Sequence, residues 1–458
     1  MQLSLDNLHV TVVQAMAEER DWLFDALKFD EPGARYSATF KAKSWDGTHR
    51  LYNKVLGRFP AGLLGLVQLK ARETTFPVEV TDRRTRIEPF PVPTPWLDRV
   101  REQPQALEAC LSRGRGVVWA PTGSGKTEVI VGLGAMVPCR WLILTHKAQL
   151  LSQIQERFLA RTGEEVGICG DGIWQPRRIT VATFQTLYKG RRLAAVRTLV
   201  WEAQGLIVDE CHVLPAGTFR AVVSLCPNAF WRFGFSATPF NRRDNRDLLL
   251  AAATGPVIFR VKAGVLIERG VLSRPAIRFV LHEQEDAGVI YTDTYRLLVV
   301  ESETRNKLIV EIARKAAKPC LLFVREVDHG RRLARELEGA DLRVAFVHGT
   351  DSVHKRKQGI KLLRRNDLDV LIASDIFDAG IDIPEVASVV NAAGGRSPTQ
   401  AIQRLGRGMR TTEAKSSIDF WDVNDVGSAW LKDHSESRRG AYTEEGYEVQ
   451  ELAEVSQA

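Results

Sequence analysis

The loop at residues 120–127, with the sequence APTGSGKT, restricts the fold of this chain more than any other stretch. An apolar run at residues 116–119 precedes the loop, and residues 128–131 after it can begin a helix. A strand, a glycine-bearing loop and Lys-Thr at a helix start form the setting in which a phosphate-binding loop is credible. Ala120 stands where such a loop usually has its first glycine. The pattern predicts a phosphate site within an α/β domain.

Each part of this loop has a chemical role. Glycines let the backbone amides curl around a phosphate chain, and the helix start adds the positive end of its dipole. Lys126 is expected to neutralise the β- and γ-phosphates, and the Thr127 hydroxyl to complete the ligand shell of Mg²⁺. The predicted nucleotide-binding residues are Pro121, Thr122, Gly123, Ser124, Gly125, Lys126 and Thr127.

Length and composition set wider limits. The chain has 458 residues, enough for roughly two to four domains. No apolar run reaches the ~18 residues that span a bilayer, and residues 1–6 do not begin a secretion signal, so we expect no membrane partner and a cytoplasmic location. The six cysteines form no Cys-x-x-Cys pair, which predicts neither disulfides nor structural zinc. A net charge of +7 mildly favours a polyanionic partner.

The first 90 residues predict a small α+β domain of their own. The expected elements are a helix at 21–29, a strand at 36–43, a strand at 50–52 and a helix at 63–69. Asp46-Gly47 is a hairpin signal between the two strands. Alternating prolines at residues 89–95 predict a stiff extended linker that ends this domain.

Basic residues are frequent in this first domain. Ten basic residues stand against four acidic ones between residues 41 and 86, with Trp45 and Tyr52 among them. Basic strands with interleaved aromatic rings favour contact with a nucleic-acid backbone, for which Trp45 and Arg50 are the candidates. The alternative interpretation is a solvated face of a sheet.

Apolar strand candidates then alternate with helical stretches in two successive regions. The predicted strands of the first region are 116–120, 141–145, 179–182, 205–208 and 233–236, and those of the second are 320–324, 344–348, 370–373 and 388–391. This alternation is typical of a parallel sheet covered by helices. We expect two tandem doubly wound α/β domains at residues 91–257 and 258–435, with a linking stretch up to about residue 281. A tail at 436–458 follows and is expected to fray at its end.

Two further motifs suit the chemistry of a phosphate site. Asp209 and Glu210 follow the apolar run at 206–208, where Asp209 can hold Mg²⁺ through water and Glu210 can polarise the attacking water. Arg407 and Arg410 are three residues apart on a predicted helix, so they share a face and can stabilise charge on a transferring γ-phosphoryl group. Alone, the acidic pair predicts a solvated loop and the arginines a basic surface helix.

Together these segments resemble the motifs of superfamily 2 helicases and translocases. The loop at 120–127 resembles motif I, Asp209–Glu210–Cys211–His212 resembles motif II in a DECH variant, and residues 236–239 resemble motif III. Residues 374–384 resemble motif V and residues 403–410 resemble motif VI. The resemblance covers residues 101–410 and implies two RecA-like domains, with ATP and Mg²⁺ as cofactors.

The resemblance also assigns roles residue by residue. It implies adenine recognition by Gln103, with Gln105 as the alternative, and contact of Gly380 and Asp382 with ribose or the γ-phosphate. Gln403 is expected to face the γ-phosphate beside the two arginines. The residues implied to couple the nucleotide site to nucleic acid are His212, Ser236 and Thr238, and those implied to contact nucleic acid are Thr145, Lys147, Thr183, Gln185, Arg325, His348 and Ser374.

Short stretches narrow the resemblance further. Residues 43–64 are similar to the N-terminal domain of phage UvsW-type branch-migration helicases, and residues 265–272 are similar to XPB-type repair helicases. This implies a helicase that translocates 3′→5′ and acts on forks, Holliday junctions and R-loops, with single-stranded, duplex and branched DNA or RNA–DNA hybrids as partners, as a monomer in a prokaryotic or phage-infected cytoplasm. Three alternatives stay open: an RNA helicase, the motor subunit of a restriction or nuclease complex, and an ATP-gated clamp or annealing protein.

Overall fold

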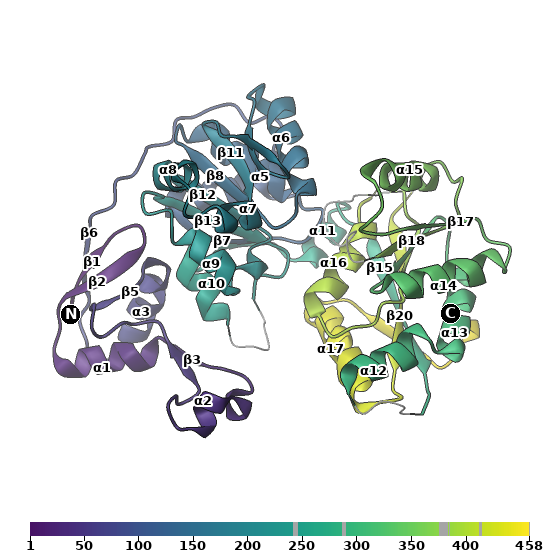
Figure 1. The fold of residues 1–458 in the computed structure, drawn as a ribbon. Coiled ribbons are helices and arrows are strands. Elements are labelled where there is room, and N and C mark those ends of the chain that lie inside the picture. The colour runs from purple at the N-terminus through teal and green to yellow at the C-terminus, as the bar shows by residue number, and fades with distance from the viewer. Residues whose placement is uncertain (241–245, 286–289, 375–382, 384, 412–414, 458) are drawn as a thin grey trace. The chain divides into compact units, whose positions relative to one another are not determined.

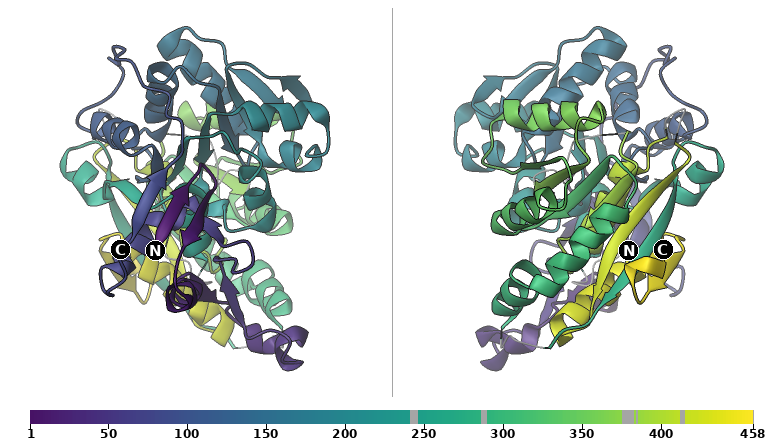
Figure 2. Two further views of the ribbon diagram at one scale, coloured as in Figure 1. Left: turned by 90° about the vertical axis from the view of Figure 1, so that its left-hand side faces the viewer. Right: turned by 90° about the vertical axis from the view of Figure 1, so that its right-hand side faces the viewer.

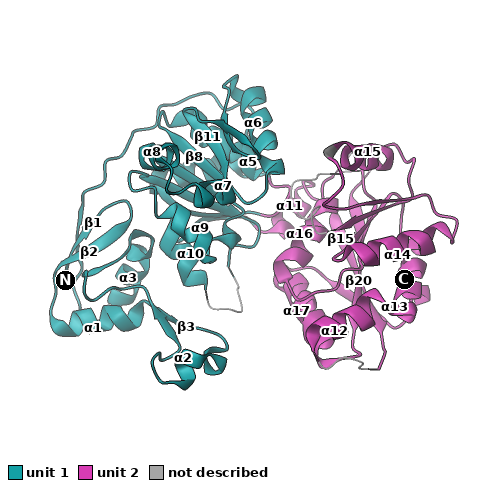
Figure 3. Ribbon diagram, in the orientation of Figure 1, with its two compact units in different colours: residues 1–120, 125–261 teal, residues 121–124, 262–458 magenta. Residues whose placement is uncertain are grey.

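The computed structural model describes residues 1–240, 246–285, 290–374, 383, 385–411 and 415–457 (Figure 1). Tertiary contacts divide the chain into two units, residues 1–120 with 125–261 and residues 121–124 with 262–458 (Figure 3). Gly380 and Asp382, two of the predicted site residues, lie outside the described residues. No helix among the residues that the structure describes is long and apolar enough to cross a membrane.

The first unit begins with a small mixed sheet, coloured purple in Figure 1. Its strand order is β5-β2-β1-β6, and the bounds are β1 Gln2–Leu5, β2 His9–Gln14, β5 Arg58–Pro60 and β6 Glu79–Asp82. Alternate residues of β1 and β2, such as Leu3 and Val10, are buried, as the two-residue period of a strand requires. They pack with Leu23 of α1 (Ala17–Ala26) and Val67 of α3 (Leu64–Ala71).

The strand predicted at residues 36–43 is wrong. The short helix α2 (Ala38–Lys41) occupies this stretch, because the Ser37 hydroxyl accepts a hydrogen bond from the Phe40 amide at 3.2 Å and caps the helix. The strand after the Asp46-Gly47 turn, β4 (Thr48–Arg50), pairs instead with the distant β3 (Lys28–Asp30). Tyr52 is only 2% exposed, so its ring belongs to the core and not to a nucleic-acid surface.

The rest of the first unit is an eight-stranded sheet of order β10-β9-β11-β8-β12-β13-β7-β14. Among the strand pairs that the described residues form in this sheet, β9–β10 is antiparallel and the others are parallel. The strands are β7 Arg115–Trp119, β8 Trp141–Thr145, β9 Gly167–Gly170, β10 Ile173–Gln175, β11 Ile179–Thr183, β12 Gly205–Asp209, β13 Trp231–Ser236 and β14 Val257–Arg260. The helices are α4 Gln103–Arg113, α5 Lys126–Met136, α6 Gln149–Thr162, α7 Phe184–Lys189, α8 Ala194–Glu202, α9 Gly217–Val223 and α10 Asp247–Thr254.

The second unit is a seven-stranded parallel sheet of order β17-β18-β16-β19-β20-β15-β21. Its strands are β15 Arg274–His282, β16 Cys320–Val324, β17 Val344–Val347, β18 Val370–Ser374, β19 Ser388–Asn391, β20 Ser417–Asp425 and β21 Val449–Leu452. Its helices are α11 Ala263–Glu268, α12 Tyr291–Tyr295, α13 Glu303–Lys315, α14 Val327–Glu338, α15 Val353–Arg364, α16 Pro398–Gly408 and α17 Ala429–Glu444. Figure 2 shows the helices of this unit in green and yellow against its sheet.

The prediction of two tandem parallel-sheet α/β domains after a small α+β part is confirmed. Two local expectations are wrong. The linking stretch up to residue 281 contains β14, which joins the first sheet, and β15, which lies inside the second. The expected fraying does not occur at residues 455–457, because β21 pairs with β15, Val455 is buried and its carbonyl accepts a hydrogen bond from Lys315 Nζ at 2.7 Å.

Candidate functional site

The predicted site residues of the first unit meet at one edge of its sheet. Strands β11, β8, β12, β13 and β7 are parallel neighbours, so their carboxyl ends lie side by side. The phosphate loop follows β7, while Ser236, Asp209, Thr145 and Thr183 end the other four strands. Ligands of open α/β sheets bind outside the carboxyl ends of the strands. This edge is therefore the candidate nucleotide site of the first unit.

The predicted phosphate loop makes a tight turn before α5. Gly125 precedes α5 with a φ of +84°, a conformation that favours glycine. The Ser124 amide donates to the Pro121 carbonyl at 3.2 Å, which closes a turn in the loop. Lys126 Nζ donates to the Ala120 carbonyl at 3.1 Å, so the ammonium group lies back over the loop where phosphates are expected.

Gln103 lies against this loop at the first residue of α4. Its side chain is buried and its Oε1 accepts a hydrogen bond from the Asp98 amide at 2.8 Å. A Cβ added to Gly125 would lie 2.1 Å from Gln103 Nε2, so the glycine is needed for this close approach. Gln105, the alternative adenine-reading residue, is exposed on the same helix. The geometry favours Gln103 of the two.

Asp209 and Glu210 stand at the end of β12, joined to β13 through a hydroxyl. Ser236 Oγ donates to Glu210 Oε2 at 3.3 Å, and His212 Nδ1 lies 3.2 Å from the same Oγ and 3.3 Å from Glu210 Oε2. The Thr238 amide also donates to Ser236 Oγ at 3.2 Å. One serine hydroxyl thus connects the acidic pair with the start of the segment that follows β13.

Glu210 has an unusual backbone conformation. Its φ is +53°, in the left-handed region that non-glycine residues seldom adopt, and its amide donates to Asp209 Oδ1 at 3.1 Å. Such a conformation costs on the order of 1–3 kcal/mol and persists where the surroundings enforce it. The left-handed backbone of Glu210 marks the point where β12 ends and the segment Cys211–Val213 begins.

The pKa values of the Asp209 and Glu210 carboxyl groups are shifted in opposite directions. Burial, followed by the charge of Glu210, raises the pKa of Asp209 to about 7. Burial acts in the same direction on Glu210, but a hydrogen bond from His212 and the charge of Lys126 outweigh it and lower the pKa of Glu210. When two carboxyl groups lie this close, ionisation of both is unfavourable unless a cation offsets the repulsion between their charges. A nearby cation would let both carry charge.

The donor set suits Mg²⁺ bound together with a nucleotide. Mg²⁺ prefers oxygen ligands and usually takes one or two carboxylates together with substrate phosphates. Thr127 and Asp209 supply a hydroxyl and a carboxylate at this edge of the sheet. Among the described residues, no group of three His, Cys, Asp or Glu side chains could hold a metal alone. The residues therefore fit a magnesium ion that arrives with phosphates.

The predicted residues of motif VI lie on and after α16 in the second unit. Gln403 is buried, and Arg407 is half-buried in the last turn. The expectation that Arg407 and Arg410 share a helix face is wrong, because α16 ends at Gly408 and Arg410 forms a β-bridge with Leu272. A Cβ on Gly408 would lie 1.9 Å from Ile418 Cδ1, so the end of α16 packs closely against β20.

The predicted nucleic-acid contacts of the two large sheets fall into three groups by exposure. Thr145, Thr183 and Ser374 are buried at strand ends, where Thr183 caps α7 by accepting from the Thr186 amide. Gln185 and Arg325 are exposed. Lys147 and His348 are partly buried, and Thr350 Oγ1 lies 2.9 Å from His348 Nδ1. The side chains of Gln185 and Arg325 are accessible to a nucleic-acid strand, whereas the buried threonines end β-strands and, in the case of Thr183, cap the following helix.

Trp45 and Arg50 have partners within the N-terminal part. Trp45 Nε1 donates to the Thr48 carbonyl at 2.7 Å. Arg50 Nη2 pairs with Asp46 at 2.6 Å, and its guanidinium carbon lies 4.7 Å from the Phe24 ring centroid. Both side chains therefore have structural contacts of their own, whatever else they bind.

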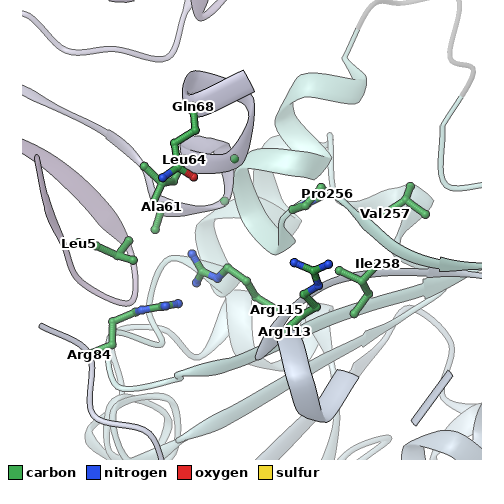
Figure 4. Close-up of a pocket in the computed structure, with 12 residues that line it drawn as sticks. Leu5, Ala61, Leu64, Gln68, Arg84, Arg113, Arg115, Pro256, Val257 and Ile258 are labelled. Carbon is green, nitrogen blue, oxygen red and sulfur yellow. The ribbon is translucent and has the colours of Figure 1, made fainter. Parts of the chain in front are cut away.

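A basic pocket that no sequence motif predicts lies where the N-terminal part meets the large sheet of the first unit. Its volume is about 380 Å³, and Arg84, Arg113 and Arg115 line it (Figure 4). Arg115 Nη2 donates to the Asn7 carbonyl at 2.8 Å, so β7 and the loop after β1 are joined there. The three arginines belong to segments that no sequence pattern connects.

Two family models match the chain in consecutive positions. Residues 96–241 match the model described as "Type III restriction enzyme, res subunit", and residues 303–412 match "Helicase conserved C-terminal domain". The chain belongs to superfamily 2 of the helicases. The matches fall on the parts of the two large sheets that carry the predicted motifs. This helicase also resembles UvsW and XPB proteins, as the sequence predicted.

Curated relatives have related names. A "Putative DNA 3′-5′ helicase Rad25" of Halobacterium salinarum is 30% identical over 374 residues, which are 78% of this chain and 57% of that protein. The "ATP-dependent DNA helicase uvsW" of Enterobacteria phage T4 is 23% identical over 479 residues, with 93% of this chain and 90% of that protein covered. The chain spans 57%, 60% and 49% of the first three curated relatives that it matches.

One solved structure has a similar fold, and at its low sequence identity the similarity concerns the fold and not the function. The fragment of a putative HsdR subunit of a type I restriction enzyme from Vibrio vulnificus has a TM-score of 0.56 at 19% identity, and the match covers 77% of this chain and 67% of that one.

Proposed function

We propose that this helicase hydrolyses ATP to move 3′→5′ along DNA and to unwind or migrate branched DNA such as forks, Holliday junctions and R-loops. The observation that carries the proposal is the edge of the first sheet, where Lys126, the carboxylate pair and the Ser236 hydroxyl converge. This is the set of groups that phosphoryl transfer to water requires: a cation for the phosphates, an oxygen ligand for Mg²⁺ and a base for water.

The residues of this edge divide the work of hydrolysis. Lys126 binds the β- and γ-phosphates, and Thr127 with Asp209 would hold Mg²⁺, which neutralises charge on the phosphates when bound. Glu210 has a lowered pKa, so it is ionised and can accept a proton from water. Gln403, Arg407 and Arg410 keep the roles that the resemblance predicts, sensing the γ-phosphate and stabilising its charge.

Ser236 is suited to couple hydrolysis with movement. Its hydroxyl contacts Glu210, His212 and the Thr238 amide together, so a change at the γ-phosphate that moves Glu210 also alters the segment after β13. Switching elements of nucleotide-driven proteins work through such local rearrangements. We infer that Ser236, His212 and Thr238 transmit the state of the nucleotide.

The choice of DNA rests on the relatives. Both named above are called DNA helicases, and the T4 protein matches along nearly its whole length, the N-terminal part included. A net charge of +7 is compatible with a polyanionic partner. We propose single-stranded, duplex and branched DNA as partners, RNA–DNA hybrids as further substrates, a monomeric state and a cytoplasmic location.

A second candidate has an observation of its own. The model matched by residues 96–241 is named after a restriction subunit, and the HsdR fragment shares the fold. On this view the chain is the motor of a nuclease complex. Co-purification of a stoichiometric nuclease subunit with the full-length chain would favour it over a stand-alone remodelling enzyme.

A substrate panel tests the main proposal. ATP hydrolysis and strand displacement are measured on forks, Holliday junctions, R-loops, linear duplexes and RNA duplexes, with ATP and with a non-hydrolysable analogue. We expect the strongest stimulation by branched DNA, and no displacement with the analogue or with Lys126→Ala. Stronger stimulation by RNA contradicts the choice of DNA, and ATP binding without displacement on any substrate indicates a clamp.

A further inference from the structure

A second pocket lies wholly within the second unit, at the carboxyl ends of β16 and β19. Its volume is about 500 Å³. Arg325 follows the last residue of β16, and the loop 393–397 joins β19 to α16. Residues of α12 and α17 complete the walls. Of the segments with a predicted role, Arg325 and Arg404 of the 403–410 stretch contribute to this pocket, while the other lining residues belong to no predicted motif.

Three aromatic rings form one wall. The Tyr291 ring centroid lies 6.2 Å from that of Trp430 and 5.0 Å from that of His434. Arg325 Nη1 donates to Tyr291 Oη at 3.0 Å, which fixes the tyrosine ring at the rim. The Trp430 ring is supported by Tyr291, yet 49% of the residue is exposed. A large, supported and half-exposed indole is a surface on which a base can stack.

Positive charge dominates the pocket. Arg325 and Arg396 are exposed at its rim, and Arg404 is buried at its floor with Nη1 donating to Asn391 Oδ1 at 2.8 Å. Burial first, and then the surrounding arginines, lower the pKa of His434 to about 4. Its Nδ1 is buried and has no hydrogen-bond partner among the residues that the structure describes. Such a field favours a phosphate group over a neutral or basic ligand.

The loop 393–397 is held rigidly and leaves room for a ligand. Gly394 and Gly395 have φ values of +58° and +87°, and a Cβ added to Gly395 would meet nothing within 4 Å. Arg305 Nη1 donates to the Ala392 carbonyl at 2.9 Å, and Arg438 Nη1 donates to the Gly395 carbonyl at 2.7 Å. Two buried arginines thus fix the backbone before anything binds, which lowers the entropy cost of binding.

We propose that this pocket binds one nucleotide of a DNA single strand, with its base stacked on Trp430 and its phosphate held by Arg325 and Arg396. The proposal rests on the proposed function and adds Trp430 and Arg396, which belong to none of the predicted helicase motifs, to the contact already expected of Arg325. Exposed aromatic rings beside arginines are the means by which proteins bind single strands without reading their sequence. The pocket would grip the strand and would not select a base.

Fluorescence anisotropy with a labelled oligo-dT strand and the full chain tests the stacking contact. Trp430→Ala should weaken binding about 5- to 150-fold, and Trp430→Phe should restore most of it, because a phenyl ring still stacks. The matched control is Trp201→Ala, which removes another exposed tryptophan, 62% exposed on α8 of the first unit, and should bind like the wild type. On an abasic strand of equal length, Trp430→Ala and the wild type should bind equally.

The salt dependence of binding tests the phosphate contact. Arg396→Gln should reduce the slope of log K against log salt concentration by about 0.7. Arg331→Gln is the control, because Arg331 pairs with Asp328 at 3.0 Å as Arg396 pairs with Asp433 at 3.1 Å, but on α14 away from the pocket. An unchanged slope for Arg331→Gln is expected.

The outcomes separate this proposal from the proposed function. If Trp430→Ala binds oligo-dT within twofold of a wild type whose ATPase is stimulated by DNA, the pocket proposal is wrong and the helicase proposal stands. If Trp430→Phe is as weak as the alanine variant, or the loss persists on the abasic strand, stacking is refuted. A wild type that does not bind oligo-dT and is not stimulated by DNA overturns both.

Discussion

Asp425→Asn removes one charge from a buried ion pair beneath the loop 393–397. Arg305 Nε and Nη2 donate to the two carboxylate oxygens of Asp425 at 2.8 and 3.1 Å, and the side chains are 0% and 2% exposed. Loss of one partner leaves a buried guanidinium without its counter-charge, which typically costs about 3–5 kcal/mol. Because an asparagine carbonyl can still accept one hydrogen bond, we expect a loss of about 3 kcal/mol.

Thermal unfolding of the full chain measures this loss. For a unit of roughly 200 residues, about 3 kcal/mol corresponds to a decrease in Tm of roughly 6–12 °C. The control is Asp328→Asn, which removes an exposed ion pair with Arg331 and should change the free energy of unfolding by less than about 1 kcal/mol. A Tm of Asp425→Asn within 2 °C of the wild type would refute the argument from burial.

Three further experiments follow from the structure. Burial alone would raise the pKa of Asp425, but Arg305 and His282 outweigh it and lower this pKa to about 2, below the ordinary 3.8. The ionised carboxylate therefore stabilises the fold fully above about pH 4, and up to about 2.5 kcal/mol of the free energy of unfolding should be lost as the pH falls toward 2. Acid titration followed by thermal unfolding measures this loss, which an Asp425→Asn chain should not show. Glu210→Gln should retain binding of a fluorescent ATP analogue while ATP turnover falls about 10²- to 10⁴-fold, and unchanged turnover would exclude Glu210 as the base. Gly62→Ala should loosen the N-terminal part, because the new Cβ would lie 2.1 Å from the backbone oxygen of Ala251; faster proteolysis of residues 1–82 is expected, while Gly65→Ala, whose Cβ meets nothing within 4 Å, should digest like the wild type.

Much of the α/β architecture could be predicted from the sequence because its strands are fully buried. The runs at 141–145 and 320–324 are continuous and apolar, since both faces of a parallel sheet are covered by helices. Strand β20 was missed because its run Ser417–Asp425 mixes apolar residues with aspartates. Two of those aspartates, Asp422 and Asp425, are buried because Arg438 of α17 and Arg305 of α13 donate hydrogen bonds to them.

The N-terminal part was harder to predict for a related reason. Residues 36–43 alternate like a strand, yet the Ser37 cap and the pairing of β4 with β3 give a short helix instead. Short segments have weak intrinsic preferences, and the tertiary partner decides between them. Trp45 and Arg50 looked like surface contacts in the sequence, but their partners Thr48, Asp46 and Phe24 became apparent only in the structure.

The sequence by itself determined the phosphate loop, the acidic pair and the order of the motifs, because each of these is a contiguous stretch whose chemistry depends on neighbours along the chain. Only the tertiary structure decided how Ser236 connects Glu210 with His212, and that Tyr291, Trp430 and His434 share a wall with Arg325. These contacts join residues from different elements, and their positions follow from strand order and helix packing, which no local pattern in the sequence encodes.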